Sequence, residues 1–325
     1  MKRVLAISLA LLASCALIFG ATLIKPAAPT SDGQYKLGMG TAVTLSADEA
    51  KATVTTVAVI TDGNGDIVDC VIDCGDFGIS FDDVKAQNSQ SYLTKNELGD
   101  DYGMVAYAGA KAEWYEQAEY FASYVVGMNA KEATYLELSG DAKPADADLL
   151  AGCTIAVADF KAALIKAMGD TLAVTFKCDE TPALSIAMTN SDSISEYDSE
   201  NDSYPVSMNT DVCAVATYED KALAAVIDIA QTDFSYNSEG AVSTSFGGTK
   251  REKLDSYGMV AYAGASYEWY EQADYFCDYI KGMTAEEIAA IEMGEGGKAA
   301  DADLLAGCTV YIGGFVQIAV KAMGK

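Results

Sequence analysis

The segment YGMVAYAGA at Tyr102–Ala110 returns unchanged at Tyr257–Ala265, 155 residues later. A second stretch, EWYEQA, keeps the same offset at Glu113–Ala118 and Glu268–Ala273. A repeat of this length indicates a duplicated domain, since solenoids stack at least three short units. The sequence therefore predicts two tandem domains.

The domain limits follow from this offset. We predict an amino-terminal segment over 1–33, a first copy over 34–169 and a second copy over 170–325. The polar stretch Asn190–Tyr204, rich in Ser, Asp and Glu, has no apolar periodicity and predicts a mobile loop early in the second copy.

Each copy begins with strand patterns. Thr53–Thr61 and Ile67–Ile72 are rich in β-branched residues and flank DGNGD, which predicts a hairpin. The second copy keeps the strands at Val212–Thr217 and Leu223–Ile227.

Helix patterns follow the strands in each copy. Apolar residues recur with the 3.6-residue period of a helix. In the first copy this stripe is Trp114, Ala118, Phe121 and Val125, and in the second it is Trp269, Ala273, Phe276 and Ile280. The predicted fold class is α+β, with each domain a small antiparallel sheet followed by helices on one of its faces.

The amino terminus predicts export. Lys2 and Arg3 precede an uncharged apolar run, Val4–Ile24, which is long enough to span a bilayer. A cleaved signal peptide fits the same residues. Leu12–Cys15 (LASC) resembles a bacterial lipobox with Cys15 as the lipidated residue. All three alternatives place the rest of the chain outside the cytoplasm, anchored to the cytoplasmic membrane or secreted.

The composition excludes several functional classes. The chain has no histidine, so it has no Ser-His-Asp or Cys-His nucleophile and no HExxH zinc site. With 48 acidic and 21 basic residues and a net charge of −27, it lacks the clustered cations that nucleic acid requires. Electron carriers and binding proteins fit this composition better than hydrolases or transferases do.

A short motif comes before the last predicted helix of each copy. The residues are DLLAGCT, starting at Asp148 and again at Asp303. Together with the Val-rich hairpin, the motif resembles the FMN-binding domain family of exported bacterial flavoproteins. The family signature is Asp, two free positions, Ser or Thr, Gly, Ala, Thr, and a flavin transferase joins FMN to its threonine.

The resemblance implies covalent FMN at Thr154 and Thr309, with a flavin transferase and a redox partner interacting with the chain. The implied cofactor-binding residues are Asp148, Gly152, Cys153, Thr154, Asp303, Gly307, Cys308 and Thr309. The motif is degenerate, because Ala151 stands at the Ser/Thr position and Cys153 at the Ala position. The alternative is a glycine loop that enters a helix while its apolar residues pack into the core.

Aromatic residues gather in the middle of each copy. They are Tyr102, Tyr107, Trp114, Tyr115, Tyr120 and Tyr124, repeated as Tyr257, Tyr262, Trp269, Tyr270, Tyr275 and Tyr279. Such rings stack on an isoalloxazine or on a sugar, or else they fill a core, which is the interpretation that we favour for both tryptophans.

Two other patterns receive structural interpretations. The spacing Asp62-x-Asn64-x-Asp66 resembles a calcium loop, but strands flank it, so we predict a plain hairpin turn and no metal site. The basic cluster Lys250–Lys253 (KREK) is interpreted as a solvated loop.

The sequence leaves three functions open. The first is an exported, membrane-associated flavoprotein that transfers electrons outside the cytoplasm. The second is a flavin-free cell-surface module that binds carbohydrate, peptide or cell wall, and the third is a surface scaffold.

Overall fold

The computed structural model describes residues 33–80, 93–169 and 172–324. The predicted amino-terminal segment, including the apolar run Val4–Ile24 and Cys15, lies outside these residues. Within the described ranges, no helix is long and apolar enough to cross a membrane.

The first sheet is an antiparallel meander with one later strand. β1 (Gln34–Ser46), β2 (Lys51–Asp62) and β3 (Ile67–Gly78) follow one another along the chain. β4 (Val174–Lys177) comes after the helices of the first copy and pairs with β1, so the strand order is β3-β2-β1-β4.

The second sheet repeats the meander and adds its fourth strand at the opposite edge. It contains β5 (Ala183–Ile194), β6 (Tyr204–Tyr218), β7 (Lys221–Tyr236) and β8 (Val242–Ser245), in that spatial order. The loop prediction for Asn190–Tyr204 is wrong at its start, because residues 190–194 pair with β6 and extend β5.

Helices follow the meander in both copies, which confirms the α+β class with two domains. In the first copy they are α2 (Lys95–Leu98), η1 (Gly99–Tyr102), α3 (Met104–Ala108), α4 (Trp114–Val125), α5 (Ala130–Thr134), α6 (Ala147–Gly152) and α7 (Ala158–Ala167). In the second they are α8 (Lys250–Lys253), η3 (Leu254–Tyr257), α9 (Met259–Ala263), α10 (Trp269–Tyr279), α11 (Ala285–Ala289), η4 (Glu295–Gly297), α12 (Ala302–Gly307) and α13 (Gly313–Ala322).

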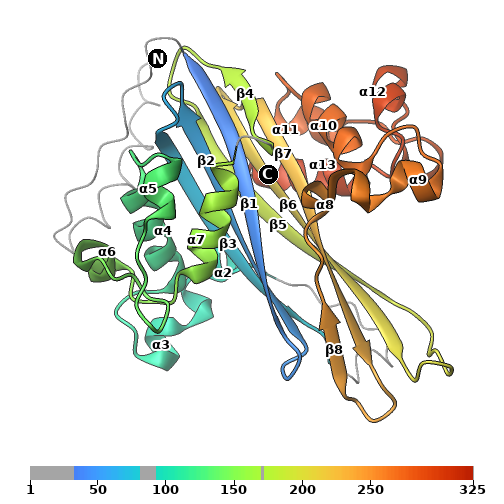
Figure 1. Ribbon diagram of the computed structural model, residues 1–325. Coiled ribbons are helices and arrows are strands. Elements are labelled where there is room, and N and C mark those ends of the chain that lie inside the picture. The colour runs from blue at the N-terminus through green and yellow to red at the C-terminus, as the bar shows by residue number, and fades with distance from the viewer. Residues whose placement is uncertain (1–32, 81–92, 170–171, 325) are drawn as a thin grey trace.

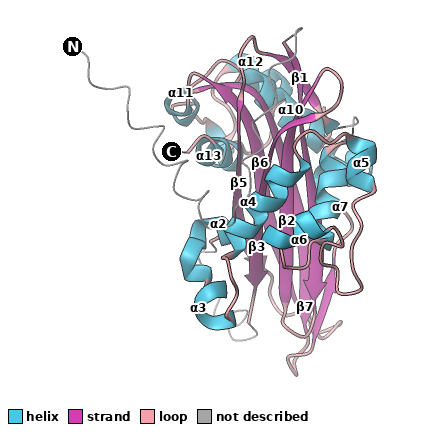
Figure 2. Ribbon diagram, turned by 90° about the vertical axis from the view of Figure 1, so that its left-hand side faces the viewer, coloured by secondary structure: helices cyan, strands magenta, loops and turns pink. Residues whose placement is uncertain are grey.

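The two sheets pack face to face, and helices cover their outer faces (Figure 1). Figure 2 shows the helices of the first copy lying across the strands behind them. Successive residues of β2 enter different cores: Ala58 and Ile60 face the other sheet, whereas Val57 and Val59 face the helices. Because both faces are covered, β2 has a continuous buried run, Val57–Ile60, instead of an alternating pattern.

The core between the sheets joins the two copies into one body. Leu37, Phe77 and Met208 lie in this core, and each is fully buried. The Tyr236 hydroxyl also donates a hydrogen bond to the Ile79 carbonyl across the two sheets. Each copy therefore has its own helix-to-sheet core but shares its second core with the other copy.

The predicted helix stripe is confirmed, since Trp114, Phe121 and Val125 are all buried against the outer face of the first sheet. Helix α7 approaches β1 closely, because a Cβ atom on Gly40 would lie 2.2 Å from the Ala163 carbonyl oxygen. Glycine on this strand thus lets helix and sheet backbones meet.

Two ion pairs cross between the copies in equivalent places. Lys166 on α7 lies 2.6 Å from Glu252, which closes the capping box of α8. Lys321 on α13 lies 2.6 Å from Glu97, which closes the capping box of α2. The reciprocal arrangement is that of an isologous interface, so the chain resembles a two-fold dimer joined into one polypeptide.

Candidate functional site

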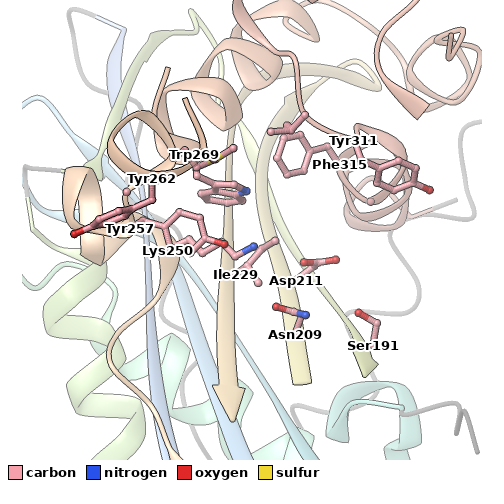
Figure 3. A pocket seen from close by; sticks show the side chains of 15 residues that line it. Ser191, Asn209, Asp211, Ile229, Lys250, Tyr257, Tyr262, Trp269, Tyr311 and Phe315 are labelled. Atoms are coloured by element: carbon pink, nitrogen blue, oxygen red, sulfur yellow. The ribbon is translucent and has the colours of Figure 1, made fainter. Parts of the chain in front are cut away.

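Two pockets, one in each copy, are built from equivalent residues. The first has a volume of about 550 Å³ and the second about 720 Å³. The first is lined by Lys95, Tyr102, Gly103, Met104, Tyr107, Ala108, Trp114, Ile155 and Ala156. Every one of these has its counterpart 155 residues later in the lining of the second pocket (Figure 3). We call them the first and the second aromatic pocket.

An exposed tyrosine forms the outer wall of each pocket. Tyr107 and Tyr262 are both 89% exposed and lie on α3 and α9, none of whose residues is buried. Gly103 has a φ of 79°, and a Cβ there would lie 2.3 Å from the Tyr107 ring. Glycine is required here for its backbone conformation and for space.

A buried carboxylate holds each tyrosine-bearing helix in place. Glu113 accepts hydrogen bonds from the backbone amides of Met104 and Val105, at 2.8 and 2.9 Å. Glu268 does the same in the second copy, at 2.8 and 3.1 Å. These bonds satisfy amides at the amino terminus of the short helix, where no intrahelical partner exists.

A lysine lies against the rings at the back of each pocket. The Lys95 Nζ atom lies 5.1 Å from the centre of the Tyr102 ring and 5.5 Å from that of Trp114. The Lys250 Nζ atom lies at 5.1 and 5.4 Å from the equivalent rings. Both are cation–π distances.

Each lysine is placed by a buried aspartate beneath it. Asp73 Oδ1 accepts from the amide of Asn96, at 3.3 Å, and so ties α2 to β3. Asp228 accepts from the amide of Arg251, at 3.0 Å, and ties α8 to β7. Burial raises the pKa of both aspartates to about 6.

The charged groups around the two lysines differ. Lys95 forms an ion pair with Asp76 on β3, at 3.2 Å. In the second copy the strand register puts Gln231 in the place of Asp76. The register also puts Asp211 in the place of Thr55, and burial raises the pKa of Asp211 to about 6, opposed by Lys250.

The first five residues of the predicted motif lie in helix α6 or α12, and its Cys and Thr begin the turn to α7 or α13. Asp148 is exposed, and its backbone carbonyl accepts from the Tyr120 hydroxyl at 3.1 Å. Gly152 lies under the same ring, because a Cβ there would be 2.3 Å from Tyr120. Asp303, Gly307 and Tyr275 repeat this arrangement.

The motif threonines bond to a buried glutamine. The amide and hydroxyl of Thr154 both donate to Gln117 Oε1, at 2.8 and 3.0 Å. Thr309 donates in the same way to Gln272, at 2.8 and 3.1 Å. The neighbouring thiols of Cys153 and Cys308 are fully buried, and burial raises the pKa of each to about 11.

The motif lies at the edge of the pocket in each copy. Ile155 and Ala156, which directly follow Thr154, line the first aromatic pocket. Val310 and Tyr311 follow Thr309 and line the second. Of the six predicted aromatic residues per copy, three line the pocket, and the tryptophan among them is also part of the core, at 5% exposed.

Sequence reasoning missed the pocket lysines. The cluster Lys250–Lys253 forms helix α8, and Arg251 is buried, so its interpretation as a solvated loop is wrong. The available signal was the identity of YGMVAYAGA in the two copies, which includes exposed residues that no core requirement explains.

Comparison of the chain with protein-family models, with curated proteins and with solved structures finds no match. Within the described ranges, no group of three or more Cys, Asp or Glu side chains is arranged to hold a metal ion.

Proposed function

We propose that this chain is a binding protein that captures saccharide units in its two aromatic pockets. The observation that carries the proposal is the segment YGMVAYAGA, which is identical in the two copies although their buried strands differ, and whose residues 105–109 and 260–264 are exposed. Residues that are exposed and identical are not explained by packing, whereas a common binding role explains both properties.

The chemistry of the pockets suits a sugar ring. The side chains of Tyr107 and Tyr262 offer flat apolar faces to the C–H groups of a pyranose, and tyrosine combines an apolar body with a polar tip. Lys95 and Lys250 offer donors for ring hydroxyls. The predicted signal or anchor supports a location outside the cytoplasm, where polysaccharides are accessible.

A glycan array of neutral and acidic polysaccharides tests the proposal. Wild-type protein is expected to bind at least one immobilised polysaccharide, and the double variant Tyr107→Ala/Tyr262→Ala is expected to lose at least tenfold in apparent affinity. Tyr135→Ala is the matched control, since Tyr135 is 70% exposed but lies outside both pockets. Absence of binding by the wild-type protein, or equal loss in the control, contradicts the proposal.

A second candidate is flavin carriage, favoured by the position of Thr154 and Thr309 at the pocket edges. An FMN attached there would have the aromatic pocket beside it, and the flavin would supply the redox chemistry. Co-expression with a flavin transferase tests this function by mass spectrometry. A gain of one or two FMN units that is lost in Thr154→Ala/Thr309→Ala supports it, and an unchanged mass contradicts it.

A further inference from the structure

We propose that the second aromatic pocket binds an acidic sugar unit, a uronate, whereas the first binds neutral units. This inference rests on the proposed saccharide-binding function. It follows from the different surroundings of two equivalent lysines, Lys95 and Lys250.

The positive charge of Lys95 is already balanced by a neighbouring carboxylate. The Lys95 side chain is 11% exposed and lies 3.2 Å from the carboxylate of Asp76. Asp76 Oδ1 also accepts a hydrogen bond from the Thr53 hydroxyl, at 2.7 Å. A carboxylate on a ligand would have to compete with this internal ion pair, so the first pocket offers no free positive charge.

Lys250 is half-buried, and its ammonium group has no carboxylate in direct contact, although Asp211 acts on it across the pocket. Among the described residues, no carboxylate oxygen lies within 4.0 Å of its Nζ atom. Gln231 occupies the position where the first copy has Asp76. A partly desolvated ammonium group attracts a ligand carboxylate more strongly than a fully hydrated one does.

A second ammonium group strengthens this side of the pocket. The Lys253 Nζ atom lies 6.0 Å from the centre of the Tyr257 ring. The first copy has Leu98 at the position equivalent to Lys253. Lys250 and Lys253 therefore both lie against the Tyr257 ring of the second pocket, in a chain whose net charge is −27.

The opposite side of the second pocket carries acceptors for hydroxyl groups. Asp211, Asn209 and Ser191 lie there, across the pocket from Lys250 (Figure 3). A uronate matches this polarity, because its carboxylate and its vicinal hydroxyls lie on opposite edges of the ring. Repulsion from Asp211 directs the ligand carboxylate toward Lys250.

Tyr311 adds a ring that the first copy lacks, since Ala156 stands at the equivalent position. It is 64% exposed and lies between Gly297 and Gly313, where added Cβ atoms would fall 2.4 and 2.1 Å from it. The second pocket thereby gains an aromatic wall.

Affinity electrophoresis with polygalacturonate and with its carboxyl-reduced form tests the inference. Lys250→Met is expected to weaken polygalacturonate binding at least tenfold, and Lys95→Met, the matched control, less than twofold. Gln231→Asp recreates the ion pair of the first copy and is expected to give the same loss as Lys250→Met. Asp76→Gln frees Lys95 and is expected to add a second site for polygalacturonate.

The outcomes separate the two proposals. Equal loss in Lys95→Met and Lys250→Met, or binding of the reduced polymer but not of polygalacturonate, overturns the inference and leaves saccharide binding standing. Failure of both polymers overturns the inference, whereas the proposed function is overturned only if the whole array is also negative. Thermal unfolding of each variant shows whether a loss of binding reflects a loss of folding.

Discussion

The two copies of the duplicated domain agree on their helical side and differ in their sheets. Both tyrosine-bearing helices are identical in sequence and are held by the same glutamate contacts. The strands have diverged, and with them the charges that reach the pockets from below, such as Asp76 in one copy and Asp211 in the other. The outer wall of the pocket is therefore the same in the two copies, whereas the floor of the pocket differs.

The core between the sheets should make the two copies unfold as one unit. Phe77→Ala removes a fully buried ring from this core and is expected to cost about 3–5 kcal/mol of unfolding free energy. Single-tryptophan variants, Trp269→Phe and Trp114→Phe, report on each copy separately by fluorescence. Trp114 and Trp269 should report the same lowered denaturant midpoint. A lowered midpoint reported by Trp114 alone would show that the copies unfold independently.

Acidification should stabilise both copies. Burial raises the pKa of Asp73 and Asp228 to about 6, above the ordinary value of 3.8. A raised native pKa means that the folded state binds more protons between about pH 4 and 6, so stability falls as pH rises through that window. For each aspartate, the free energy of unfolding is about 1–3 kcal/mol higher below this window than above it.

Calorimetry at pH 5 and pH 7.5 checks the pH effect, and the melting temperature should be higher at pH 5. In Asp73→Asn and Asp228→Asn the difference between the two pH values should shrink by similar amounts, because the two sites are equivalent. A melting temperature that does not change between pH 5 and 7.5 contradicts this account.

The two glutamines that bond to the motif threonines should contribute unequally to stability. Gln117→Ala leaves the amide and hydroxyl of Thr154 without their partner and is expected to cost about 1–3 kcal/mol. Gln272→Ala should cost more, since Gln272 also accepts from the Val310 amide at 3.2 Å. Chemical denaturation measures the loss of unfolding free energy in each variant. A larger loss in Gln117→Ala than in Gln272→Ala would show that these contacts do not set the stability of the turns.

The crossed ion pairs should have the smallest effect. Glu97→Gln and Glu252→Gln each remove one partly exposed pair, with side chains 29–40% exposed, and are expected to cost about 0–1 kcal/mol. A double-mutant cycle with Lys321→Met measures the Glu97 pair directly. A coupling above about 2 kcal/mol would mean that the pair is a principal contact between the copies.

The sequence predicted the helices and strands better than it predicted which of them pack or pair with one another. The 3.6-residue spacing of Trp114, Phe121 and Val125 identified a helix face, because periodicity is a local property. The run Val57–Ile60 identified a strand but did not reveal that its two faces enter different cores. β4 was missed, since four residues that pair with β1 from far along the chain carry little local signal.

The candidate site was predicted only in part. The aromatic residues were recognised, but Lys95 and Lys250 were not, because lysine is ordinarily solvated and nothing in its spacing shows that rings lie against it. The glycine and threonine of the motif were singled out as cofactor-binding residues, which stays a prediction, and the structure gives them local contacts with Tyr120 and Gln117.

The most direct test of the account is a fluorescence titration of the two single-tryptophan variants, because each tryptophan lines one pocket. Trp269→Phe leaves Trp114 as the reporter of the first pocket, and Trp114→Phe leaves Trp269 as the reporter of the second. Carboxyl-reduced polygalacturonate is predicted to change the emission of Trp114, and polygalacturonate that of Trp269. Saturable binding on the array with no change at either tryptophan would contradict the claim that these pockets are the binding sites.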